Sequence, residues 1–224
     1  MGLEEIAAAV EAGVEQEKHL DWEGALSVYR DGLARLATVP EDPELLALRS
    51  YARLREANAL MELGRQEEAR RCFDAGIDDA KRSGDTLTLG RALIGAGVFA
   101  ARTGDRERGE GFLLAAVESL QDREGPEERQ ALGWALLNLG GLYGKMGRLD
   151  LAFLTLHQAR EALFALSNWV GVAAAWETEA NLREALGDTE RAREDFAEAL
   201  AMYRKEGMEE KAAELQAKVG RKLV

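Results

Sequence analysis

The sequence predicts an all-α solenoid of five helical hairpins followed by a C-terminal capping helix. Ala, Leu, Glu and Arg dominate the composition and only three prolines occur in 224 residues, which favours helix throughout. A turn signal recurs at intervals of 44, 40, 43 and 40 residues, a period typical of repeat proteins built from helical hairpins. Small residues also recur at fixed distances from each turn. Together these observations indicate a chain of similar antiparallel helix pairs.

The turns set the register of the five hairpins. They fall at Leu20, Gly64, Gly104, Gly147 and Gly187. Small residues recur at three fixed distances from each turn. Seven positions before the turn they are Gly13, Ala57, Gly97, Gly140 and Ala180. Five positions after it they are Ala25, Ala69, Gly109, Ala152 and Ala192, and twelve positions after it they are Gly32, Gly76, Ala116, Ala159 and Ala199. A large apolar residue lies nine after each turn: Tyr29, Phe73, Leu113, Leu156 and Phe196. This pattern predicts two backbones in close approach, with the large residue filling the gap between them.

Capping chemistry places the hairpins at about 3–39, 43–83, 86–122, 126–167 and 169–206. Asp42 before Pro43 predicts a helix start, and Gly84-Asp85 predicts a left-handed C-cap followed by an N-cap. A last helix, 208–222, carries an apolar stripe and a charged opposite face. We interpret it as the cap that a solenoid needs; the alternative is a partner-binding or dimerising helix. No biased linker divides the chain, so we expect a single domain, 1–224.

The fourth hairpin, with Leu139-Gly140, Tyr143 and the later Ala152 and Ala159, resembles the tetratricopeptide repeat. The resemblance extends over about residues 5–205. The repeats of about 40–44 residues exceed the usual 34, as in the long-repeat variety found in kinesin light chains and bacterial regulatory proteins. The resemblance implies a right-handed superhelix.

Charge and composition disfavour several classes of function. The chain has 29 Lys and Arg against 41 Asp and Glu, a net charge of −12, which repels nucleic acid. Its longest apolar run, around residues 131–143, is too short to cross a bilayer. Cys72 is the only cysteine, so no intramolecular disulfide can form. The acidic N-terminus differs from a signal peptide. We therefore expect a cytoplasmic protein that binds neither nucleic acid nor membrane.

No pattern of residues predicts catalysis, a metal or a cofactor. His19 and His157 lie in different hairpins, and neither has a second ligand at metal-binding spacing. Residues 95–100 match the dinucleotide pattern G-x-G-x-x-A, but that pattern needs a turn from strand to helix. Here the glycines fall inside a predicted helix, so packing is the better interpretation. Glu177 and Glu184 could act as an acid and a base only in a pocket that separates their pKa values, and the abundance of helical glutamates favours a solvated face instead.

The resemblance also implies a binding surface on the first helix of each hairpin, which lines the concave face in this family. The corresponding residues are Val10, Val14, Tyr51, Leu54, Asn58, Met61, Arg91, Ile94, Val98, Arg102, Trp134, Leu137, Glu177, Asn181 and Glu184. Most are apolar in the first four hairpins, and the fifth is acidic. Two interpretations stay open: a groove for a partner, or packing between neighbouring first helices.

We therefore predict a non-catalytic scaffold that binds a peptide or helix of a partner protein in its concave groove. One alternative is a regulatory or sensor module that binds a small ligand or peptide signal. Another is a self-associating structural protein, a homo-oligomer.

Overall fold

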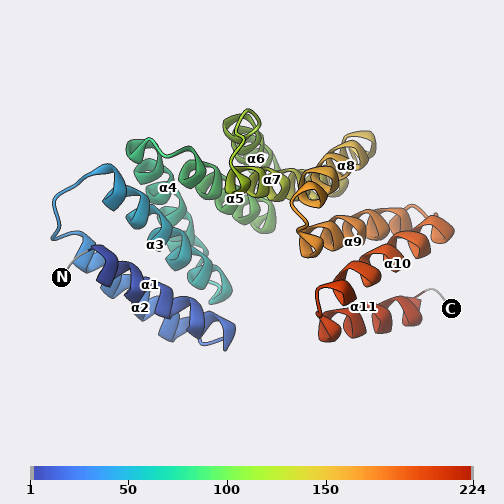
Figure 1. The fold of residues 1–224 in the computed structure, drawn as a ribbon, viewed down its shortest axis with the longest axis horizontal. Helices are drawn as coiled ribbons and strands as arrows, with labels where there is room; N and C mark the ends of the chain where they lie inside the picture. The colour runs from blue at the N-terminus through green and yellow to red at the C-terminus, as the bar shows by residue number, and fades with distance from the viewer. Residues whose placement is uncertain (1–2, 223–224) are drawn as a thin grey trace. The chain divides into compact units, whose positions relative to one another are not determined.

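The computed structural model describes residues 3–222, and in this part of the chain it contains helices and no strands. The eleven helices described are α1 (Leu3–Lys18), α2 (Trp22–Leu36), α3 (Pro43–Glu62), α4 (Gln66–Ser83), α5 (Thr86–Thr103), α6 (Arg106–Leu120), α7 (Pro126–Lys145), α8 (Leu149–Ala165), α9 (Trp169–Ala185), α10 (Thr189–Lys205) and α11 (Glu209–Lys222). Successive helices pair into the five expected hairpins, with α11 after them (Figure 1). The predicted all-α helical-repeat fold is confirmed.

The predicted helix boundaries follow local hydrogen bonding. The Asp42 carboxylate accepts a hydrogen bond from the backbone N–H of Leu45 at 2.8 Å, and Pro43 is the first residue of α3. Asp85 caps α5 in the same way, after Gly84 has ended α4 with a φ of 73°. Gly104 ends α5 at a φ of 96°. A left-handed residue of this kind stops a helix, and glycine adopts the conformation without steric cost.

The chain divides into two compact units, residues 1–119 and 120–224. The first contains α1 to α5 and nearly all of α6, and the second contains α7 to α11. In each unit the two helices of a hairpin pack against each other, and the second helix also packs against the first helix of the next hairpin. The single-domain organisation stays a prediction.

Glycines bring the helices of a hairpin into close contact. A Cβ atom added to Gly97 in α5 would lie 2.7 Å from Cγ of Leu113 and 3.2 Å from the carbonyl oxygen of Gly109, both in α6. A Cβ on Gly140 in α7 would lie 2.7 Å from Cγ of Leu156 in α8. The packing interpretation of the small-residue pattern, including the glycine pair inside α5, is therefore confirmed.

Helix α11 packs as the predicted cap on the last hairpin. Its Ala212 and Leu215 are buried in one hydrophobic cluster with Phe196 and Tyr203 of α10. On its other flank, Lys218 Nζ donates a hydrogen bond to Oδ1 of Asn181 in α9 at 2.9 Å. The helix therefore covers the apolar face that the final hairpin of a repeat protein would otherwise expose.

Candidate functional site

Three of the fifteen residues expected on the binding face lie in the core. Val10 is fully buried and Leu54 and Leu137 are each 8% exposed. Val10 faces α2, where a Cβ on Gly32 would lie 2.8 Å from its Cγ2. Leu54 likewise faces Gly76 of α4. Val10 and Leu54 thus contact the second helix of their own hairpin, and not the neighbouring first helix that the packing interpretation expected. Because Leu54 and Leu137 are buried, charged substitutions there would disturb folding.

The other twelve residues are half-buried or exposed. The half-buried ones are Val14, Tyr51, Asn58, Met61, Ile94, Val98, Trp134, Glu177, Asn181 and Glu184, and the exposed ones are Arg91 and Arg102. Some of these side chains join neighbouring first helices. Arg102 of α5 donates a hydrogen bond to Glu62 of α3 at 2.9 Å. A role of this set in partner binding stays a prediction.

Glu177 and Asn181 of the fifth hairpin contact the cap. Glu177 accepts a hydrogen bond from the Tyr203 hydroxyl at 3.1 Å, and its Oε1 lies 3.6 Å from Nζ of Lys218. Asn181 accepts from the same lysine. These two residues therefore hold α11 and α10 in place, a contact that a partner would have to replace.

A different surface of the second unit, formed by α8, α9 and α10, is both apolar and open to solvent. Its pocket has a volume of about 480 Å³. The residues that line it are Arg160, Glu161, Phe164, Val172, Trp176, Glu198 and Met202. Phe164 is 58% exposed and borders this apolar pocket, and a contiguous exposed apolar surface is typical of a binding site.

A second pocket, of about 380 Å³, adjoins this surface. The residues that line it are Pro126, Glu127, Gln130, Leu166, Asn168, Trp169 and Glu206. The rings of Phe164 and Trp169 connect the two pockets, because they meet edge to face with centroids 5.2 Å apart. We call the apolar residues Phe164, Trp169, Val172, Trp176 and Met202 the aromatic groove.

Two cations of the chain lie on the tryptophans of the aromatic groove. The Arg160 guanidinium lies 3.6 Å from the centroid of the Trp176 ring and donates to the buried Glu179 at 2.8 Å. Nζ of Lys205 lies 3.3 Å from the centroid of the Trp169 ring. Both rings therefore already make the cation–π contacts that indole rings favour.

The sequence analysis missed this groove because it considered only the first helices of the hairpins. Phe164 belongs to a second helix, α8. The available signal was the pair of aromatic residues, Phe164 and Trp169, on either side of the Ser167-Asn168 boundary.

Arg160, which lines the pocket, belongs to a charged network with Glu179, Arg183 and Asp195. The Asp195 carboxylate is buried and pairs with the Arg183 guanidinium. Its pKa is raised to about 6, first because burial disfavours the charged form, and also because the Glu179 carboxylate is near. The Arg183 and Arg160 guanidinium groups oppose this rise.

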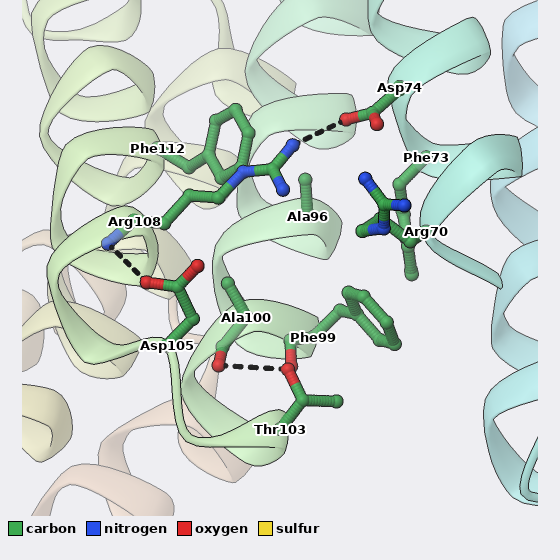
Figure 2. Close-up of a pocket in the computed structure, with 10 residues that line it drawn as sticks. All are labelled: Arg70, Phe73, Asp74, Ala96, Phe99, Ala100, Thr103, Asp105, Arg108 and Phe112. Carbon is green, nitrogen blue, oxygen red and sulfur yellow. Dashed lines mark hydrogen bonds and ion pairs between the residues drawn. The ribbon is translucent and has the colours of Figure 1, made fainter. Parts of the chain in front are cut away.

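The first unit has a smaller pocket between α4, α5 and α6, of about 50 Å³. Figure 2 shows the Arg108 side chain crossing it toward Asp74, which accepts a hydrogen bond from Nη2 at 2.8 Å. The rings of Phe73 and Phe99 form part of its wall, 5.2 Å apart. The pocket is too small for more than a side-chain tip or a few waters.

No group of three or more His, Cys, Asp or Glu within residues 3–222 could hold a metal ion. None of the helices in that range combines the length and apolar character needed to cross a bilayer. Cys72 is half-buried, and burial, with the nearby Glu56 carboxylate, raises the pKa of its thiol to about 12.

The fold matches solved helical-repeat proteins. No protein-family model matches the sequence, and no curated protein matches it either. The structure of BtubC (BKLC) from P. vanneervenii aligns over 90% of this chain and 82% of its own, with a TM-score of 0.72 and 19% identity. TTC0263, a thermophilic TPR protein of Thermus thermophilus, aligns over 97% and 98% respectively, with a TM-score of 0.60 and 22% identity.

The chain has the fold of tetratricopeptide-repeat proteins. A third similar structure is a Rap protein in complex with Competence and Sporulation Factor, which aligns over 99% of this chain and 75% of its own, with a TM-score of 0.55 and 13% identity. The likenesses to these structures establish the fold. Within this fold both helices of a hairpin make the close contacts, and the aromatic groove involves two second helices, α8 and α10.

Proposed function

We propose that the protein is a non-catalytic interaction scaffold that binds a segment of a partner protein in the aromatic groove. The observation that carries this proposal is the open apolar pocket of about 480 Å³ beside the exposed Phe164 ring. Pockets of this size are large enough to enclose a ligand group. Buried aromatic anchors of this kind supply most of the binding energy of protein interfaces.

The helical scaffold supports binding by holding the groove in a fixed shape. Val172 and Trp176 project from α9, while Phe164 and Met202 project from α8 and α10. Because rigid helices carry all four side chains, little conformational entropy is lost when a partner binds. The concave face predicted from the sequence is a second possible contact surface, and its twelve accessible residues remain candidates.

A selection experiment with matched variants tests the proposal. Peptides would be selected from a phage-displayed random library on the immobilised protein, and their affinities measured by fluorescence anisotropy. We expect Phe164→Ser to weaken the selected peptides by about tenfold or more, the loss typical of an aromatic anchor.

Leu154→Ser is the matched control, because Leu154 lies on the same helix and is 55% exposed, but lines neither pocket. We expect it to leave the affinities unchanged, and thermal unfolding would verify that both variants fold. If the selected peptides bind the Phe164→Ser variant as tightly as the Leu154→Ser variant, the groove has no role in binding them.

A regulatory module is the second candidate, favoured by the Rap protein, which shares the fold and was solved with a bound factor. In that case the groove would bind a signal rather than a segment of a folded partner. Native mass spectrometry of the purified protein distinguishes the two, because a tightly bound signal would appear as a defined mass that denaturation removes.

A further inference from the structure

We infer that the aromatic groove selects a partner segment in which an apolar side chain is flanked by lysine or arginine. This inference rests on the proposed function and adds the chemistry of the partner. The apolar anchor would enter the pocket beside Phe164, and the flanking cations would lie over the carboxylates at its rim.

The charges around the groove favour a cationic segment. The residues that line the two pockets include four glutamates and one arginine: Glu127, Glu161, Glu198, Glu206 and Arg160. Glu161 and Glu198 are exposed on α8 and α10, at the pocket that contains Phe164.

The arginine does not offset these carboxylates, because its charge is already paired. Arg160 donates to Glu179, which is buried beneath the groove. Near Glu161 the structure places His157, whose Nε2 is 3.4 Å from Oε1. A basic segment would therefore meet net negative charge at the rim of the pocket that contains Phe164. The net charge of −12 adds a long-range attraction for such a partner.

The tryptophans indicate where a partner cation would lie. Lys205 approaches the Trp169 ring to 3.3 Å although its side chain is otherwise exposed to solvent. The ring face therefore stabilises an ammonium group in this environment. A lysine or arginine of the partner would compete with Lys205 for that face, so the chain's own lysine acts as a weak competitor of the partner.

Three fluorescein-labelled synthetic peptides of equal length test the inference. One contains Lys-Lys-Leu-Phe-Lys-Lys, the second replaces each lysine with glutamate, and the third keeps the lysines but replaces Leu-Phe with Gly-Ser. We expect the first peptide to bind about tenfold more tightly than either of the others, measured by anisotropy at about 0.15 M salt. Higher salt would reduce the advantage over the glutamate peptide, because rim charges are screened.

Charge reversal at the rim separates the groove from general attraction to an acidic protein. Glu161→Lys with Glu198→Lys should weaken the first peptide by about tenfold and strengthen the glutamate peptide. Glu118→Lys with Glu214→Lys is the control, since both residues are exposed, lie outside the pockets and change the net charge equally. We expect it to change affinity by less than about twofold. Lys205→Met should strengthen the first peptide by about threefold, because it removes the competitor.

The outcomes distinguish this inference from the proposed function. If the lysine and glutamate peptides bind equally and both weaken in Phe164→Ser, the groove binds segments but does not select basic ones, and the inference is wrong. Equal effects of the rim and control charge reversals would also overturn it. If Phe164→Ser weakens none of the peptides, both the inference and the proposed binding site are wrong.

Discussion

Arg160 covers the Trp176 ring, with its guanidinium 3.6 Å from the ring centroid, and donates a hydrogen bond to Glu179 at 2.8 Å. One side chain of α8 thus contacts two residues one turn apart on α9. The Glu179 side chain is only 4% exposed. Its charge needs a partner, because a buried carboxylate without one is costly.

Replacing this arginine should destabilise the second unit. We expect Arg160→Met to lower the free energy of unfolding by about 2–4 kcal/mol, since it leaves the buried Glu179 with the more distant Arg183 at 3.7 Å. Urea denaturation measures the change. Arg191→Met is the control, because Arg191 is exposed and its 3.4 Å contact with Asp188 lies at the surface; the expected change is below about 0.5 kcal/mol. Similar losses in both variants would contradict a structural role of the Arg160 contact.

The buried Asp195 predicts a pH dependence of stability. Its pKa is about 6 in the folded protein and near the ordinary value of about 3.9 in the unfolded chain. Between these values the folded state binds more protons, so this group makes the protein more stable as the pH falls from about 7 to 4. The groups that face it are Arg183, Glu179 and Arg160.

Asp195→Asn removes this titration. As the pH falls through about 6, we expect the unfolding free energy of the original protein to rise relative to that of the variant. Urea denaturation between about pH 4.5 and 8 measures both curves. Loss of the ion pair with Arg183 separates the two curves by an amount that does not depend on pH. Parallel curves would therefore show that the pKa of Asp195 is not raised.

Two glycines of the third hairpin should respond oppositely to alanine. Gly97→Ala forces a methyl group against Leu113 and the backbone of α6, and we expect a loss of about 1–3 kcal/mol from overpacking. Gly111 is exposed within α6, and a Cβ there meets no described atom within 4 Å. Gly111→Ala should therefore add about 0.5–1 kcal/mol, because alanine favours helix. Chemical denaturation compares the two, and equal effects of both substitutions would be inconsistent with close packing at Gly97.

The Cys72 thiol should react slowly in the folded protein. Its pKa of about 12 leaves little thiolate at pH 8, and thiolate is the nucleophile. Relative to an ordinary cysteine we expect roughly a thousandfold slower alkylation by iodoacetamide. The urea-unfolded chain is the internal control and should react at the ordinary rate. Comparable rates in the two states would show that the thiol is accessible and unperturbed.

The hairpins and their boundaries could be predicted because they depend on local chemistry. Asp42, Asp85 and Gly84 cap helices through bonds to residues within three or four positions. The spacing of small residues reports a repeated contact between adjacent helices, so Gly97 and Gly140 could be assigned to packing. The accessible surface was harder to predict. Val10, Leu54 and Leu137 satisfy the spacing of the binding face, yet they pack inside the protein.

The sequence by itself determined how the helices pair, where Asp42 and Gly84-Asp85 cap them, and which positions need small side chains. These properties follow from hydrogen bonds and steric contacts between residues that are near in the chain or related by the repeat. Only the tertiary structure decided which apolar side chains reach solvent. Phe164 and Leu163 are adjacent in α8, yet Leu163 is buried and Phe164 is exposed. Exposure depends on how the neighbouring helices α9 and α10 cover each face of α8, and no residue pattern within α8 specifies that cover.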